Sequence, residues 1–321
     1  MKAHFLEGNT MPSFQLLDAR QTAEHLPWSA LIQEIVRLLG DDSVSVPPRL
    51  VRALPGGGSL FVMPANDNRI AITKLITFTP ANNGTDRPTI QGDVVVFDIA
   101  TGQRMLLLDG PTVTARRTAA VSALAALKLA SNNEGPLLIV GAGVQGKAHL
   151  EAFSEVLKIK RVMIASKSQA SAQALAAHAE AMGLAATVVL NPNAALAECP
   201  LAVTCTPASG VVLSALPGRD GFISAVGAFA PQMVELSAAL CRHVATEGNV
   251  FVDTSDALHE AGDLLQAGLD VSRFATLAEV VRNAVRQDVK KPAGPVLFKS
   301  CGWAGWDLAA ARTATRRPES S

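Results

Sequence analysis

The sequence lacks an excess of either charge. Its 321 residues include 28 lysines and arginines against 28 aspartates and glutamates, for a formal net charge of zero. Such a balance gives no long-range attraction to polyanions, so nucleic acid and anionic membranes are not expected partners. No stretch approaches the about 18 consecutive apolar residues that a membrane span requires. No apolar run follows the amino-terminal stretch MKAHFLEGNT either, and we expect a cytoplasmic protein.

Cysteine is also scarce. Cys199, Cys205, Cys241 and Cys301 are scattered, with no C-x-x-C pair and no histidine at the spacing of zinc ligands. This pattern is typical of neither a metal site nor a disulfide framework. We therefore expect reduced cysteines that lie mostly in the core, and no metal.

The length favours two domains, because 321 residues are about twice the size of a typical domain. Up to about residue 115, an amphipathic helix lies between Pro27 and Gly40. It is followed by the strand-like runs SLFVMPA, IAITKLITF and DVVVFDIATG. These runs predict a sheet built mainly of neighbouring strands.

From Pro111 the pattern changes. Residues 112–131 predict a long helix with Thr112 or Thr114 as N-cap, and strand-like and helical segments then alternate as far as residue 254. The expected fold class is therefore α/β, with a Rossmann-type doubly wound parallel sheet domain at residues 118–298. An α+β domain is expected at residues 1–117. Residues 299–321 complete it, because FKSCGWAGWDLAAARTA predicts a helix that returns to the first half.

The stretch LLIVGAGVQGKAHL, residues 137–150, is the strongest motif. Four apolar residues precede G-x-G-x-x-G and a helical pattern follows, which is the context of a dinucleotide-binding turn. The first glycine permits the turn, the second leaves room for a pyrophosphate, and the third lets the helix pack closely on the strand. The alternative is a tight turn that binds nothing. We expect dinucleotide contacts, some of them to N–H groups at the helix start, at Gly141, Gly143, Val144, Gln145 and Gly146.

The end of the second predicted strand distinguishes the cofactors. Sites for NAD usually present Asp or Glu there for the ribose hydroxyls, whereas this chain has Ser166, Lys167 and Ser168. A lysine between two hydroxyls suits a 2′-phosphate. NADPH is therefore favoured, with NADH an alternative if Lys167 is only a solvated turn residue.

Three cationic positions in the first half indicate an anion pocket. Arg49 lies in VPPRLV, Lys74 interrupts the apolar strand IAITKLITF, and Arg116 and Arg117 open the long helix. A charge buried in a strand without a partner is unfavourable, and an arginine fork matches a carboxylate. Consecutive helix residues point about 100° apart, so only one arginine of the pair can face a given pocket. Each cation taken singly could instead belong to a surface ion pair.

The chain resembles the ornithine cyclodeaminase and mu-crystallin family. The matching stretches follow the family's order over nearly the whole chain, and besides the glycine turn they are PPR (47–49), TKLITF (73–78), PTIQG with VVVFD (88–98), LLLDGPTVTARRTAAVSALA (106–125), VTCTP (203–207), ISAVGA with P and EL (223–236), VFVDT (250–254), EAGDL (260–264) and LFKSCGWAGWDLAAA (297–311).

The resemblance implies roles for these positions. Arg49, Lys74 and Arg117 would hold the substrate carboxylate, with Arg117 also near the cofactor, and the first half would bind substrate and pair in a homodimer. The family member that binds NADPH has Asn-Arg-Thr where this chain has its Ser-Lys-Ser, which supports the phosphate interpretation. Further positions expected near the cofactor or the nicotinamide side are Thr89, Thr204, Thr206, Val226, Gly227, Ser300 and, beside the substrate, Cys301.

The chain departs from true ornithine cyclodeaminases at Phe229. Those enzymes carry an aspartate there that handles the amino groups of ornithine, whereas VGAFAPQ places a phenyl ring at this position. A ring suits a substrate that is already cyclised: Δ1-pyrroline-2-carboxylate or Δ1-piperideine-2-carboxylate. We therefore expect imine reduction by hydride transfer, giving proline or pipecolate, with Lys74 as proton donor or as an electrostatic clamp.

The alternatives are a plain core role for Phe229, ornithine cyclodeamination, an amino-acid dehydrogenase or another ketimine reductase, and a non-catalytic NADPH-binding protein. His149, Asp253, Asp256 and Asp307 are expected to be structural.

Overall fold

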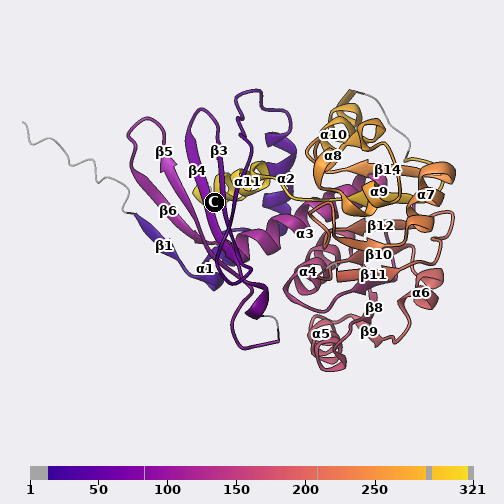
Figure 1. Ribbon diagram of the computed structural model, residues 1–321. Coiled ribbons are helices and arrows are strands. Elements are labelled where there is room, and N and C mark those ends of the chain that lie inside the picture. Colours follow the sequence, from indigo (N-terminus) through magenta and orange to yellow (C-terminus); the bar gives the residue numbers. More distant parts are fainter. Residues whose placement is uncertain (1–13, 83, 208, 287–290, 317–321) are drawn as a thin grey trace, which may run out of the picture.

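The computed structural model describes residues 14–82, 84–207, 209–286 and 291–316. It contains two large sheets that lie side by side, with helices between and around them (Figure 1). Within these residues, no helix combines the length and apolar character needed to cross a membrane.

The first sheet is built from neighbouring strands, as the sequence predicts. Its spatial order is β1-β6-β5-β4-β3-β2, antiparallel throughout except for the parallel pair β1 and β6. The strands are β1 (Gln15–Leu17), β2 (Leu50–Ala53), β3 (Ser59–Asn66), β4 (Ile70–Phe78), β5 (Ile90–Asp98) and β6 (Arg104–Asp109).

Alternation in β4 decides what faces the core. Ile70, Ile72, Lys74 and Ile76 are buried on one face, whereas Leu75 on the other face is exposed. This period of two places the Lys74 side chain among core residues. A lysine in that position requires a partner inside the fold.

Four helices contact the elements of this half and one another (Figure 1). They are α1 (Ala19–Glu24), α2 (Trp28–Leu38), α3 (Gly110–Leu129) and α11 (Ala304–Thr315). The predicted return of the last helix is confirmed, because α11 packs against α2, α3, β3 and β4.

Two boundary predictions were wrong. The N-cap of α3 is Asp109, whose carboxylate accepts a hydrogen bond from Thr112 N at 2.8 Å, and not Thr112 or Thr114. The last predicted helix begins only at Ala304, because the residues before it form strand β16 (Val296–Lys299) and a turn. Pairing with two neighbouring strands holds β16 extended, and this is a long-range effect.

The second sheet is the predicted doubly wound parallel sheet. Its order is β15-β14-β16-β12-β10-β7-β8-β9, so the strand order reverses between β7 and β10. Ligands of open parallel sheets bind at such a switch point, beyond the carboxyl ends of the strands. The strands are β7 (Leu137–Val140), β8 (Arg161–Ala165), β9 (Ala185–Val188), β10 (Leu201–Thr204), β12 (Phe222–Ala225), β14 (Asn249–Val252), β15 (Ala275–Thr276) and β16.

Shorter elements complete this half. A small sheet pairs β11 (Ser209–Leu213) with β13 (Val234–Leu236). The helices are α4 (Val144–Leu157), α5 (Gln169–Ala181), α6 (Pro192–Ala195), α7 (Ala238–Glu247), α8 (Ala257–Glu260), α9 (Gly262–Gln266) and α10 (Leu277–Arg286).

Helix α3 connects the two halves. It contacts β5 of the first sheet and also β12 and α4 of the second half. The expected boundary between residues 117 and 118 therefore falls inside one continuous helix, and the division into two domains stays a prediction. Residues 1–13 and 317–321 of the expected first domain lie outside the described residues.

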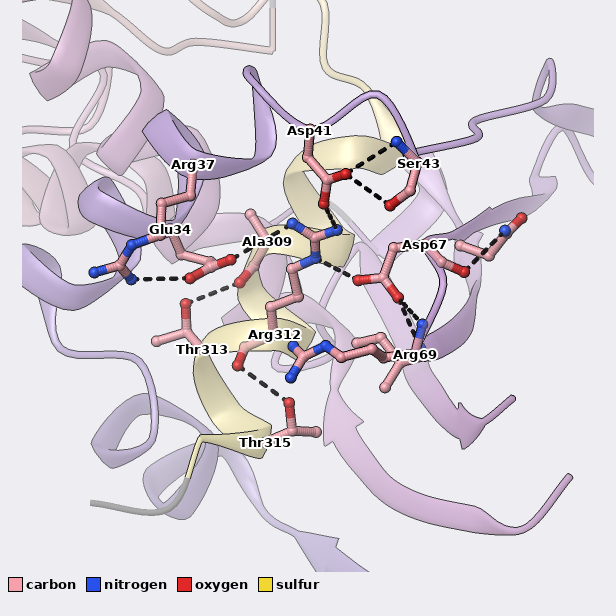
Figure 2. Close-up of polar contacts among 12 residues, drawn as sticks. Glu34, Arg37, Asp41, Ser43, Asp67, Arg69, Ala309, Arg312, Thr313 and Thr315 are labelled. Carbon is pink, nitrogen blue, oxygen red and sulfur yellow. Dashed lines mark hydrogen bonds and ion pairs between the residues drawn. The ribbon is translucent and has the colours of Figure 1, made fainter. Parts of the chain in front are cut away.

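A buried ion cluster fastens α11 to the first half (Figure 2). The Arg312 guanidinium contacts Asp67 through Nε at 2.6 Å and Asp41 through Nη2 at 2.6 Å, and its Nη1 lies 3.6 Å from Glu34 Oε1. The Arg312 side chain is only 6% exposed. Glu34 lies on α2, Asp41 in the loop after it and Asp67 in the turn between β3 and β4. Because these acids come from separate parts of the first half, the contact fixes where the last helix lies.

We expect Arg312→Ala to lower the free energy of unfolding by about 3–5 kcal/mol, because it leaves Asp67 and Glu34 buried without this cation. Urea denaturation followed by circular dichroism would measure the change. The matched control is Arg20→Ala, which removes an exposed pair with Glu24 and should leave the unfolding midpoint unchanged. Equal midpoints for the two variants would contradict a stabilising role for the cluster.

Candidate active site

The glycine turn follows β7 at the switch point of the second sheet. Two of its glycines are required by the protein itself. At Gly141 φ is +116°, and a Cβ would lie 2.7 Å from the Cys205 carbonyl oxygen. A Cβ at Gly146 would collide with the Gly141 carbonyl oxygen. These two positions account for the tight turn and for the close packing of α4 on β7.

Gly143 differs from both. Its φ of −88° is open to any residue, and a Cβ there would meet no protein atom within 4 Å. No side chain caps α4, and Val144 in its first turn is 71% exposed. The first N–H groups of α4 therefore face open space, where an anion would be favoured. Since packing does not require glycine at position 143, a ligand explains it better than a tight turn alone.

The end of β8 lies beside this turn, because Gly141 N donates to the Ala165 carbonyl at 2.9 Å. Ser168 caps α5 through a bond from Ser171 N to its hydroxyl, and Ser168 N donates to the Ser166 hydroxyl. Lys167 is exposed. Of the three residues that were predicted to bind a 2′-phosphate, Lys167 is thus the one that supplies a charge.

A buried glutamate organises the neighbouring loops. Glu235 is fully buried and accepts hydrogen bonds from Thr204 Oγ1 at 3.0 Å, Thr206 N at 2.6 Å and Gly227 N at 2.7 Å. Val226 N donates to the Thr204 carbonyl at 2.9 Å. The buried hydroxyl of Thr204 therefore holds Glu235, and the expected place of Thr204 near the cofactor stays a prediction. No local pattern in the sequence marks Glu235 as an organising residue.

Asp253 does the same for the turn after β16. It accepts hydrogen bonds from Ser300 Oγ at 2.8 Å, Cys301 N at 3.1 Å and Gly302 N at 2.8 Å. The buried Ser300 hydroxyl is therefore bonded inside the protein. Burial raises the pKa of the Cys301 thiol well above its usual value, which keeps it neutral. All four cysteines are free, as the sequence suggested, and three are buried.

His149 has the structural role that the sequence predicts. It is buried, its Nδ1 lies 2.7 Å from the Gln145 carbonyl oxygen, and its Nε2 lies 3.0 Å from the Ser122 hydroxyl. Burial lowers the pKa of His149 to about 4. The neutral ring thus joins the helices α3 and α4.

Asp307 joins two of the predicted substrate-binding cations. Lys74 Nζ lies 2.8 Å from Asp307 Oδ2, and Arg117 Nε lies 3.3 Å from Asp307 Oδ1. All three side chains are nearly or fully buried. Asp307 therefore does more than the sequence suggested: it is the counterion of the cluster. A lone acid in the small-residue helix WDLAAARTA was the available signal, of the same kind as Lys74 in its strand.

The surroundings of Lys74 lower the pKa of its ammonium group. Desolvation lowers the pKa of Lys74 to about 8, with Arg117 and Arg49 adding to the decrease and Asp307 opposing it. Two cations and one carboxylate leave one net positive charge in the Lys74–Arg117–Asp307 group. This charge matches one substrate carboxylate.

Arg49 lies near this group, on a contact between the two halves. Its Nη2 is 2.5 Å from Oε1 of Glu260, at the end of α8. Both residues line a small cavity together with Met63, which pairs with Lys74 across β3 and β4. Gly302 lines it too, and a Cβ there would approach Arg117 Nη1 to 3.2 Å. The cavity thus lies beside all three predicted cations.

Arg116 turns away from this group, as the helical geometry predicts. Its Nε donates to the Leu26 carbonyl at 2.8 Å, and its guanidinium lies 3.9 Å from the centre of the Trp28 ring. Only Arg117 of the pair contacts Asp307. The two arginines therefore have separate roles.

Phe229 forms a second contact between the halves. Its ring meets Phe78, at the end of β4, edge to face at a centroid distance of 6.3 Å. Phe78 on β4 pairs with Ile90 on β5. Thr89, which precedes Ile90, accepts a hydrogen bond from Thr79 N on its carbonyl oxygen at 2.8 Å. Phe229 and Thr89 therefore lie at the same end of the first sheet, where the second half approaches it.

The family model of the ornithine cyclodeaminase/mu-crystallin family matches residues 19–320. The chain belongs to this family. Relatives within it include Delta(1)-pyrroline-2-carboxylate reductase 2 of Burkholderia ambifaria, which is 36% identical over 309 residues, 95% of each chain. The Delta(1)-pyrroline-2-carboxylate/Delta(1)-piperideine-2-carboxylate reductase of Azospirillum brasilense is also 36% identical, over 93% of this chain and 94% of the relative.

A solved structure of the family has the same fold. The Thermococcus litoralis Delta(1)-pyrroline-2-carboxylate reductase, solved with NADH and L-proline, superposes with a TM-score of 0.84 at 24% identity. The match covers 93% of this chain and 95% of the other. At this identity the likeness supports the fold, and residue roles depend on the geometry described above.

We expect Gly143→Ala to fold normally but to bind a nicotinamide dinucleotide at least about tenfold more weakly, because the methyl group would occupy ligand space. Titration of the cofactor by fluorescence, with a thermal melt, would test this. The comparison variant is Gly146→Ala, which should lower the melting temperature because its Cβ meets the Gly141 carbonyl. Unchanged affinity in Gly143→Ala would favour a turn that binds nothing.

Proposed function

We propose that this enzyme reduces a cyclic imino acid, Δ1-pyrroline-2-carboxylate or Δ1-piperideine-2-carboxylate, to L-proline or L-pipecolate with a nicotinamide cofactor. The observation that carries this proposal is the group of Lys74, Arg117 and Asp307 beside the Arg49 cavity, with its single net positive charge. The names of the relatives agree with it. The substrate offers one carboxylate to this charge and one C=N bond to the reaction.

The side chains supply binding and orientation. Arg49 and Arg117 hold the substrate carboxylate. Lys74, which is paired with Asp307 as Arg117 is, adds positive charge to the site. A bound nicotinamide supplies the hydride that the imine carbon accepts. Fixing the imine carbon against that hydride is the contribution of the arginines, since orientation of a bound pair lowers a barrier by several kcal/mol.

Phe229 selects among the reactions of the family. A phenyl ring can pack on the methylenes of a five- or six-membered ring, but it offers no carboxylate to the second amino group of ornithine. Its contact with Phe78 brings two aromatic rings together where the halves meet, and this supports an aromatic wall beside the substrate. This wall favours imine reduction over cyclodeamination of ornithine.

An activity panel tests the proposal. Oxidation of NADPH and NADH is followed with both cyclic imines and with pyruvate plus ammonia, and release of ammonia from ornithine is measured with NAD. We expect turnover with a cyclic imine above the other substrates. Turnover with pyruvate would indicate an amino-acid dehydrogenase, and none with any substrate would leave a dinucleotide-binding protein.

We expect Arg49→Ala to lower kcat/KM for the cyclic imine by about 30-fold or more, because truncating one partner of a desolvated charge pair removes about 2 kcal/mol or more. Steady-state kinetics measures this. The dissociation constant of NADPH should stay unchanged, since Arg49 lies in the first half, away from the glycine turn. A loss of cofactor affinity instead would place the substrate site elsewhere.

We infer further that NADPH is preferred over NADH, with Ser166, Lys167 and Ser168 beside the 2′-phosphate. Lys167→Ala should weaken NADPH binding about tenfold, the worth of one charge-assisted hydrogen bond, and leave NADH binding unchanged. Titrating both cofactors against both proteins provides the internal control. A wild-type protein that binds NADH as tightly as NADPH would contradict the preference.

We also propose a homodimer formed through the first sheet. Leu16, Leu50 and Leu75 are 64%, 59% and 45% exposed. The strand register places them on the sheet face opposite to Lys74. Exposed apolar residues gathered on one face are typical of an interface.

A further inference from the structure

Reduction of an imine requires a proton as well as a hydride. The neutral C=N bond accepts hydride poorly, and its nitrogen must gain a proton to become the product amine. The groups near Arg49 that can carry a proton are Lys74, Cys301, Asp256 and Glu260. Their positions differ in a way that selects one of them.

Two of these groups are unsuited to repeated proton transfer. Lys74 is 1% exposed and its ammonium is held on Asp307 at 2.8 Å, so it has no contact with solvent from which to regain a proton. Cys301 is buried, and its thiol is kept neutral by a raised pKa. Asp256 also lines the cavity, but it lies at the exposed start of α8, one helical turn before Glu260, and among the described residues Arg49 forms its ion pair with Glu260.

Glu260 has both properties that an acid catalyst needs. Its Oε1 contacts Arg49 at 2.5 Å inside the cavity, and its side chain keeps 19% of its surface exposed. The other oxygen, Oε2, is buried and accepts no hydrogen bond from the residues that the structure describes. A proton on Glu260 would therefore sit on Oε2, while Oε1 remains bonded to Arg49.

We propose that Glu260 is the proton donor to the imine nitrogen, an assignment that rests on the proposed reduction of a cyclic imino acid. Arg49 binds the substrate carboxylate next to the carboxyl group that it already contacts. The Oε2–H bond breaks as an N–H bond forms, and the resulting iminium carbon accepts the hydride from the reduced nicotinamide. Glu260 is left as a carboxylate paired with Arg49. Because Oε2 itself is buried, the group regains its proton through the part of the side chain that stays exposed.

The charges around Glu260 support this role. Desolvation, opposed by Arg49 and supported by the nearby carboxylates of Asp256 and Asp253, raises the pKa of Glu260 to about 7. Cys301, a further titratable neighbour, stays neutral. A carboxyl group with such a pKa is half protonated near neutral pH, where a general acid is most effective.

Glu260→Gln tests the assignment because glutamine keeps the volume and the oxygen that faces Arg49 but carries no acidic proton. We expect kcat with the cyclic imine at pH 6 to fall by about 100-fold or more. The dissociation constant of NADPH, measured by fluorescence without substrate, should not change. A rise in KM alone would mean that Glu260 only positions Arg49, and it would overturn the proposal.

The pH profile provides the second readout. Wild-type kcat/KM should fall as pH rises through about 7, because the acid form of Glu260 is lost. This limb should be absent in Glu260→Gln, and the substrate's own titration is common to both proteins. Asp256→Asn should keep the limb but move it to lower pH, because removing a like charge lowers the pKa of Glu260.

The outcomes separate the two proposals. A wild-type protein that reduces no cyclic imine refutes the proposed function itself. A wild-type protein that does so, together with a Glu260→Gln variant that keeps both the rate and the limb, overturns the role of Glu260.

Discussion

The carboxylate of Asp307 is the contact on which the site depends. It lies fully buried between the ammonium of Lys74 and the guanidinium of Arg117. Taking three charges out of water is strongly unfavourable unless they are paired at close range. The arrangement also joins β4, α3 and α11, which come from the beginning, the middle and the end of the chain. The same residues therefore supply the positive charge of the site and hold distant parts of the chain together.

Buried carboxylates organise the cofactor side in a similar way. Glu235 holds the loops after β10 and β12, and Asp253 holds the turn after β16. Asp263 accepts hydrogen bonds from Glu235 N at 2.6 Å and Leu236 N at 2.9 Å, and it pairs with the buried Lys299 at 3.0 Å. Each carboxylate accepts bonds from backbone N–H groups that a loop would otherwise bury unpaired. Loops fixed in this manner can line a ligand site without first having to become ordered themselves.

The residues of the proposed site lie where the halves meet. Arg49 contacts Glu260 and Phe78 contacts Phe229, and each of these pairs joins residues of different halves. Beside the first pair, Gly302 leaves room for the Arg117 guanidinium. Neither sheet alone has both the cationic group and the glycine turn. The fold of the family is shared by proteins named for several reactions. Under the proposed function, specificity within it would depend on a few side chains at this contact, among which Phe229 departs from the residue expected in ornithine cyclodeaminases.

The sequence by itself determined the features that depend on near neighbours along the chain. The glycine turn, the alternation in β4 and the strand and helix alternation after Pro111 all have periods of a few residues, and each was found where it was expected. Lys74 could be singled out for the same reason, because its strand is otherwise apolar. The family resemblance added the roles of Arg49 and Arg117.

Tertiary structure alone decided which residues these cations meet. Asp307 follows Lys74 by more than two hundred positions, and Glu260 is similarly distant from Arg49, so no local pattern relates them. The strand at Val296–Lys299 was missed because pairing with β12 and β14, rather than its own composition, keeps it extended. The partners of a buried charge are set by how distant segments pack. A desolvated charge is stable only beside an opposite charge, and that charge can come from any place in the sequence.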